Sequence, residues 1–525
     1  MKILYVLFFT LLISATLRSQ SNFLHEQKMR LSQDSWLSMP AEHTNRLLSN
    51  IEINRYSDLV PNPNETYIRD TINTSLNDSM KYNMYGDLRD DNPLYNKKSP
   101  LWTVALRVTG TNLTTLLIDR YIFKYDFSNV GFNSWSYNIK KGWEWDLDRF
   151  GMNYFFHPFS GGMYFNAARA NGYSFFESVP FAFLGSLEWE YFGETTQPSY
   201  NDFINTPVNG TFLGEIFYRL GSNILDDQST GADRFFRELA VAVITPTRFL
   251  SRLLDGDLTR LTPEEVYQKE PLNITLNAGY HKVNPGTKIE NKGTSSLNID
   301  LILDYGNPFE KRTRKPFDYF RVQTDLDFGV GRKIIDMLTG YGILFGSNLQ
   351  SGNLEMLTGL FQQMNYFDNN TFELGTIALG PGIISKMQVN NNSSFYNNLH
   401  VDIVPFGALS NRHGITDTSQ VRDYNYAGGA QVKLESTYNI GGRVAISFIG
   451  YYWWLHTFVG IAGNNYIALI KPRIAVRLFN NVSLGFEHMI YYSNRVPSNF
   501  PSISSVRTEQ KVFLQIFLEE FKFKK

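Results

Sequence analysis

The second half of the chain alternates between apolar and polar residues with a period of two. Leu297, Ile299 and Leu301 share one parity, while Asn298 and Asp300 share the other. Because successive side chains of a strand point to opposite faces, such a segment has one apolar and one polar face. About twelve segments show this pattern, and they lie near 272–282, 295–305, 318–331, 339–349, 352–364, 371–384, 396–409, 424–439, 441–456, 464–479, 481–493 and 504–521.

The length of these segments favours membrane strands. Strands of soluble sheets usually have about 5–6 residues, whereas a tilted membrane strand needs about 9–11. Many of the alternating segments are longer than that, and aromatic residues gather near their ends, as in the interfacial girdles of membrane barrels. The pattern therefore predicts an antiparallel transmembrane β-barrel of about 12 strands over residues 270–525.

Short and long connections alternate between the segments. If the first strand rises from the periplasm, the inner turns near 350–351, 440–441 and 480–481 are tight, and the outer loops 410–423 and 494–503 are long. This asymmetry is typical of outer-membrane barrels. The links near 306–317 and 385–395 are expected to be longer than the rule requires. The alternative is a large soluble β-protein, which predicts the same alternation with shorter strands.

The beginning of the chain is typical of an exported protein. One lysine precedes an apolar run over 3–13, and small and polar residues follow, which predicts a signal peptide over 1–20. Residues 21–97 are polar with little periodicity, and we expect a flexible arm. Later in the chain no charge-free apolar stretch reaches the length of a membrane helix. The expected location is the cell outer membrane, with the N-terminal region in the periplasm or the barrel lumen.

Residues 98–260 combine dense aromatic residues with helical spacing. Apolar residues recur at threes and fours over 203–220, Ser199 or Asn201 is placed to cap that helix, and Pro207 is expected to kink it. A second helix is predicted over 233–254, interrupted by a proline. The predicted fold class is therefore α+β, with an aromatic-rich helical domain preceding the barrel.

Composition removes several classes of function. The chain has 525 residues and no cysteine, so disulfide scaffolds, cysteine-ligated metals and cysteine nucleophiles are excluded. Its formal net charge of -1 gives no reason to expect nucleic acid as a partner. Nothing in the sequence implies a cofactor.

The aromatic block contains a specific set of short motifs. They are His157-Pro158, Gly162, Tyr164, Asn166 to Arg169, Gly185-Ser186, Trp189-Glu190, Gly193-Glu194, Pro198-Ser199, Asn201-Asp202, Gly214-Glu215 and Tyr218-Arg219. Together they resemble a bacterial family of exported, outer-membrane proteins of unknown function, over roughly residues 143–257. Tyr200 stands where the family pattern is expected to have an aliphatic residue. The resemblance implies architecture and location but no activity.

Two interpretations of the polar residues in this block remain open. In the first they tie a helical core together by ion pairs, as the i,i+4 spacing of Glu215 and Arg219 indicates. The residues assigned to binding or to this structural role are Arg169, Asn166, Asp202, Glu215 and Arg219.

The second interpretation is a lipid-modifying acyl hydrolase or acyltransferase. His157 would be the general base, Ser160 the nucleophile, and Glu190 or Glu194 the residue that orients the imidazole. The chain has no Gly-x-Ser-x-Gly elbow, the motif that presents a nucleophilic serine in many hydrolases. It also has no His-Glu-x-x-His motif, so no metal site is predicted.

A third class of function is binding or transport. The helical domain is expected to plug the barrel or to cap its mouth, and the expected partners are outer-membrane lipid and a small-molecule or lipid ligand. The sequence thus predicts an integral outer-membrane barrel with a structural, binding or transport-related role, and it leaves an enzymatic role open.

Overall fold

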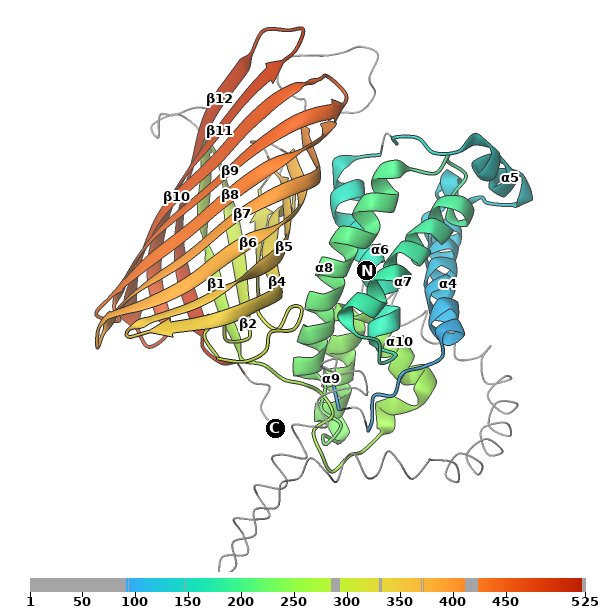
Figure 1. Cartoon of the computed structure of the whole chain (residues 1–525), viewed down its shortest axis with the longest axis horizontal. Helices are drawn as coiled ribbons and strands as arrows, with labels where there is room; N and C mark the ends of the chain where they lie inside the picture. The colour runs from blue at the N-terminus through green and yellow to red at the C-terminus, as the bar shows by residue number, and fades with distance from the viewer. Residues whose placement is uncertain are drawn as a thin grey trace, which may run out of the picture.

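The computed structural model shows a helical domain followed by a closed β-barrel (Figure 1). The structure describes residues 91–92, 94–146, 148–284, 293–329, 333–369, 371, 373–410 and 424–521. The predicted signal peptide and residues 21–90 of the predicted arm lie outside these described residues.

The helical domain contains seven α-helices among the described residues, joined by short π- and 3-10 helices. Their bounds are α4 Leu101–Ile118, η1 Asp119–Phe123, η2 Asp126–Ser128, α5 Phe132–Lys141, η3 Met152–Phe156, α6 His157–Arg169, α7 Phe175–Glu188, η4 Trp189–Gly193, α8 Tyr200–Ile224, α9 Gly231–Ile244, α10 Pro246–Asp255 and η5 Asp257–Thr259. Within the described residues, no helix combines the length and the apolar content needed to cross a membrane.

Two local predictions agree with these helix bounds. The hydroxyl of Ser199 caps α8 by accepting a hydrogen bond from the backbone N–H of Asp202 at 3.3 Å. Pro246 divides the helix predicted over 233–254 into α9 and α10, because proline fits the first turn of a helix but not its interior.

Twelve antiparallel strands close the barrel. They are β1 Leu272–Asn284, β2 Thr294–Tyr305, β3 Phe320–Phe328, β4 Ile335–Ser351, β5 Leu354–Asp368, β6 Glu373–Asn390, β7 Ser393–Ser410, β8 Tyr424–Ile440, β9 Val444–Val459, β10 Gly463–Phe479, β11 Val482–Pro497 and β12 Ile503–Leu518. Closure comes from pairing of the first strand with the last, in a register that sets Ile274 opposite Leu518. The predicted fold class and strand number are confirmed.

One expected connection differs from the structure. The sequence analysis expected a long link over 385–395, but β6 continues to Asn390 and β7 begins at Ser393, so the chain turns within two residues. The strands extend this far because their backbones remain paired, with Lys386 opposite Tyr396. Backbone pairing therefore continues where the apolar alternation has ended. The turn between β6 and β7 is as short as the turn between β4 and β5.

The lumen of the barrel is filled with side chains. Arg321 on β3 reaches Glu435 on β8 at 3.0 Å, and Thr371 donates a hydrogen bond to Glu509 on β12 at 2.9 Å. Lys511 pairs with Asp325 across the seam of the barrel. These contacts join strands that are far apart in the sheet, so they cross the lumen. Several of the inward-pointing charges expected from the sequence are paired with one another, among them Arg321 with Glu435 and Arg473 with Glu487.

Aromatic rings close the lumen further. Trp453 is fully buried, and its indole N–H donates to Gln431 at 2.8 Å. Tyr451 packs against it with ring centroids 5.9 Å apart and donates to Glu435 at 2.6 Å. Large side chains held by hydrogen bonds therefore occupy this part of the lumen.

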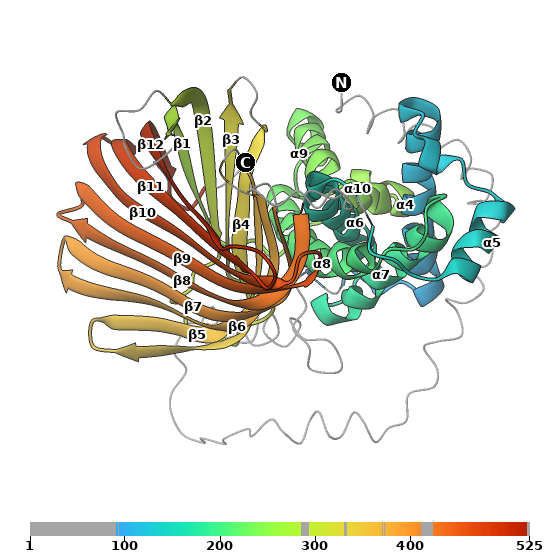
Figure 2. The same ribbon diagram turned by 90° about the horizontal axis from the view of Figure 1, so that it is seen from above.

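The helical domain lies beside the barrel, against the outer face of its wall (Figures 1 and 2). Outer-facing positions follow from the register: Arg321 points into the lumen, so Phe320 and Val322 point outward. Gly342 and Gly340 lie opposite these two residues on β4 and therefore also face outward. Side chains of the helical domain cover this part of the wall.

Aromatic rings of the helical domain fit against glycines of the wall. A Cβ atom on Gly375 would lie 2.1 Å from the ring of Tyr154 in η3, and one on Gly340 would lie 3.1 Å from the ring of Phe212 in α8. A larger residue at either position would force the ring out. The alternatives in which the helical domain plugs or caps the barrel are therefore wrong, because the lumen holds its own side chains and the helices pack on the outside.

Glycines also set the distance between α6 and α8. A Cβ atom on Gly210 would lie 2.6 Å from the Cα atom of Gly161, and one on Gly161 would lie 1.8 Å from the carbonyl oxygen of Thr206. The two helices therefore touch through their backbones. Small residues at helix interfaces allow this close approach.

We expect Gly210→Ala to destabilise the helical domain by about 1–3 kcal/mol, because the added methyl group meets rigid backbone atoms. Urea titration of the full chain, followed by tryptophan fluorescence, measures this change. Gly110→Ala is the matched control: it lies in α4 with no atom within 4 Å of its Cβ position. The control is expected to be neutral or stabilising by about 0.5–1 kcal/mol, and equal losses in both variants would contradict the interpretation.

Candidate functional site

The structure places four of the predicted residues at one end of the helical domain. His157 opens α6, and its Nε2 atom lies 3.7 Å from Oδ1 of Asp202 on α8. Glu190 is buried in η4 and accepts the backbone N–H of Ser199 at 2.6 Å. Glu194 follows directly after η4. Sequence positions separated by up to 45 residues are thus brought into one acidic cluster.

Burial controls the protonation of this cluster. It raises the pKa of Glu194 to about 8 and raises the pKa values of Glu190 and Asp202 well above their ordinary range. It also lowers the pKa of His157. The neutral forms of the carboxyl groups and of the imidazole are therefore favoured near pH 7.

The acyl-transfer hypothesis needs a serine in contact with the histidine. Ser160 lies one helical turn after His157 on α6 and is half-buried. In the part of the chain that the structure describes, no hydrogen bond joins these two side chains. The structure thus brings the histidine to a carboxyl group but not to its proposed nucleophile, and the enzymatic role stays a prediction.

Across the described ranges, no group of three or more histidine, aspartate or glutamate side chains has the geometry to hold a metal ion.

The residues assigned to binding lie in the core of the helical domain. Glu215 is fully buried and accepts two hydrogen bonds from Arg169, at 2.7 and 2.9 Å. Arg219 lies 2.9 Å from the same carboxylate. Asn166 donates to the carbonyl of Gly214 at 3.1 Å. These side chains connect α6 to α8, and their polar atoms contact other parts of the protein.

A cavity opens elsewhere, between α9, α10 and η5. Its volume is about 480 Å³. Apolar side chains dominate its walls, among them Phe235, Leu239, Val243, Phe249 and Leu261. Several of these are also exposed to the surroundings, with Phe235 62% and Leu261 64% exposed. An apolar cavity open to one side is the usual form of a small-ligand site.

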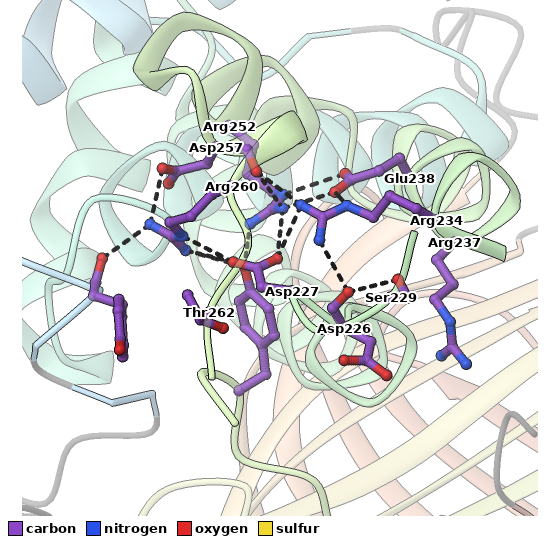
Figure 3. A network of polar contacts seen from close by, with 12 residues as sticks. Asp226, Asp227, Ser229, Arg234, Arg237, Glu238, Arg252, Asp257, Arg260 and Thr262 are labelled. Atoms are coloured by element: carbon purple, nitrogen blue, oxygen red, sulfur yellow. Dashed lines mark hydrogen bonds and ion pairs between the residues drawn. The ribbon is translucent and has the colours of Figure 1, made fainter. Parts of the chain in front are cut away.

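One polar wall of the cavity is held by a buried aspartate (Figure 3). Asp227 is 1% exposed and lies within 3.1 Å of Arg234, 2.9 Å of Arg252 and 2.8 Å of Arg260. It also accepts the hydroxyl of Tyr267 at 3.0 Å. The aspartate ties α9, α10 and the following segment together, so it fixes the shape of the cavity.

The arginines around the aspartate share a second acidic partner. Glu238 lies 3.0 Å from Arg234 and 2.7 Å from Arg252. Arg234 also donates to the backbone carbonyl of Asp226 at 2.9 Å. Asp257 lies 2.8 Å from Arg260, so the three arginines meet three carboxylates. A neutral or weakly polar ligand therefore suits the cavity better than a strongly charged one.

Sequence reasoning missed this cavity. The sequence predicts a single helix over 233–254, interrupted at Pro246. One sequence feature indicates an unusual surface here: Phe235 and Phe236 lie between Arg234 and Arg237 in the predicted helix. The pattern could not show that the second helix folds back to face the first.

Part of the helical domain matches a known protein family. Residues 142–247, about a fifth of the chain, match a family described as "Domain of unknown function (DUF3943)". This match confirms the resemblance found in the motifs and assigns no activity. No curated protein matches the chain.

Several solved structures resemble the barrel. The outer membrane channel DcaP of Acinetobacter baumannii is 7% identical, with a TM-score of 0.23, and the match covers 47% of this chain and 96% of that chain. The NanC porin is 9% identical, with a TM-score of 0.23, over 46% and 98%. The Pseudomonas putida toluene transporter TodX is 8% identical, with a TM-score of 0.21, over 48% and 89%. Likenesses this distant carry no argument about function.

We expect Asp227→Asn to destabilise the helical domain by about 3–5 kcal/mol, because it leaves buried arginines without their shared carboxylate. Urea titration of the full chain measures the loss. Glu265→Gln is the matched control, since Glu265 pairs with Lys269 and the two side chains are 40% and 32% exposed. An exposed pair contributes about 0–1 kcal/mol. A small effect at Asp227 would contradict its role as the anchor of the cavity.

Proposed function

We propose that this protein is an integral outer-membrane protein that binds a lipid or another apolar small molecule in its helical domain. One observation carries the proposal: an open apolar cavity of about 480 Å³ lies in the helical domain, whereas the barrel lumen is filled by its own side chains. The closed barrel supports the membrane location, because all its strands are paired and no edge is left open.

The cavity has the size and chemistry for an acyl chain. Ligand cavities typically measure about 300–1,000 Å³ and are lined mainly by apolar side chains with a few polar groups. Here Phe235, Leu239 and Val243 supply the apolar surface, and Thr230 and Thr259 add hydroxyl groups. Each buried methylene group of a ligand contributes about 0.8 kcal/mol, so a chain of ordinary lipid length binds by burial alone.

The filled lumen argues against a steady open pore. Polar contacts cross it from Arg321 to Glu435, and Trp453 is fully buried within it. A solute passing through would have to break these hydrogen bonds and displace the rings. Binding at the helical domain is therefore favoured over transport through the barrel.

The binding proposal predicts that the full chain, purified in mild detergent, retains phospholipid that native mass spectrometry detects. Val243→Trp places a large ring at the mouth of the cavity and is expected to abolish retention. Ala232→Trp is the matched control, because Ala232 is exposed on the same helix and does not line the cavity. Equal retention in both variants, or none in the unaltered protein, would refute the proposal.

The closed-lumen argument predicts that the full chain in planar bilayers gives no steady conductance. Trp453→Ala combined with Tyr451→Ala removes two rings that fill the lumen and is expected to produce current fluctuations. A steady pore in the unaltered protein would favour transport instead.

A further inference from the structure

The outward surface of α4 and η1 is mainly apolar. Leu101, Trp102, Leu106 and Leu113 are 67%, 60%, 62% and 54% exposed, and Tyr121 in η1 is 66% exposed. This is a continuous face on one helix. Large exposed apolar patches mark surfaces that contact a partner or a membrane.

The one charged residue of α4 does not interrupt this face. Arg107 has a side chain that is 12% exposed, and it pairs with Asp255 at the end of α10 at 2.7 Å. The helix therefore turns its charge toward the domain and its apolar side chains away from it.

The same arrangement recurs in α9. Arg234, Arg237 and Glu238 are buried, whereas Phe235 and Phe236 are 62% and 64% exposed. In a water-soluble domain the aromatic residues would be inside and the charges outside. Ionisable residues that face the interior of a helix bundle, with apolar residues outside, are typical of a membrane environment.

The helical domain extends along the barrel wall from one end of the barrel to the other. Its contact with the barrel wall runs from Phe320, where β3 begins, to Tyr424, where β8 begins, and the strand order places these two residues at opposite ends of the barrel. Helix α8 has 25 residues, or about 37 Å, which is comparable to the hydrocarbon thickness of about 30 Å. Both views show the helices beside the wall (Figures 1 and 2).

We infer that the outward face of α4 and η1 lies against the acyl chains of the outer membrane, so that the helical domain shares the bilayer with the barrel. The wall that the helices cover is the wall that would otherwise contact lipid, and α4 lies on the side of the helical domain away from the barrel (Figure 1). This inference rests on the proposed membrane location of the barrel. The occupant is bilayer lipid and not a second copy of the chain.

Spin labels test the inference, because the absence of cysteine allows single labels to be introduced. Leu106→Cys and Leu113→Cys place labels on the face of α4. Val401→Cys on β7, where the side chain is 50% exposed on the wall, is the lipid reference. Glu264→Cys, at an exposed position before β1, is the water reference. The full chain is reconstituted with one molecule per nanodisc of phosphatidylethanolamine and phosphatidylglycerol.

Collision rates with oxygen and with a water-soluble nickel chelate are then measured by power saturation. The inference expects both α4 labels to match Val401, with a ratio of oxygen to nickel collisions severalfold above that at Glu264. If the α4 labels match Glu264 while Val401 reports lipid, the inference fails and the membrane location stands. If Val401 also reports water, the proposed function fails.

Two further outcomes would overturn the inference. Labels on α4 that are shielded from both reagents in a nanodisc with one molecule would mean that another part of the chain covers the face. Spin–spin broadening of the α4 labels in detergent, absent at Val401, would mean that a second copy covers it. All four substitutions are at partly or fully exposed positions, so the fold is expected to tolerate them.

Discussion

The contact between the helical domain and the outer wall of the barrel is the interaction on which the rest of the structure depends. Its core joins α6, α7 and α8 to eight consecutive strands, from β1 to β8. Glycines on the wall leave room for aromatic rings, so that Tyr154 lies directly on Gly375. A hydrogen bond also joins the two parts: the side chain of Gln362 on β5 donates to the carbonyl of Val208 on α8 at 2.9 Å. The helices are therefore held outside the barrel, and side chains of the strands occupy the lumen.

Buried charge organises both parts of the molecule, but in different ways. In the barrel, opposite charges pair across the lumen, as Arg321 does with Glu435. In the helical domain, single carboxylates collect several arginines, as Asp227 and Glu215 do. Buried ion pairs contribute little net stability, but the loss of one partner is costly. These networks therefore fix which helices face one another, and the cavity between α9 and α10 depends on that arrangement.

The acidic cluster shows that motif residues with the chemistry of an active site can also have a structural role. His157, Glu190, Glu194 and Asp202 do approach one another, as an active site would require. Yet burial favours their neutral forms, and among the described residues no hydrogen bond joins Ser160 to the imidazole. The same motif residues also build the contact between α6 and α8. In this region the structural role is directly visible in the contacts.

The sequence by itself determined the barrel, its strand number and the presence of a helical domain. Alternation along a strand records which side faces lipid and which faces the lumen, and that information is local. Helix caps and breaks, such as Ser199 and Pro246, are local as well. The tertiary structure alone decided where the helices lie, which glycines receive aromatic rings, and where the cavity forms. These features depend on pairs such as Tyr154 and Gly375, which are more than 200 positions apart, and no local periodicity encodes which distant residue a side chain will meet.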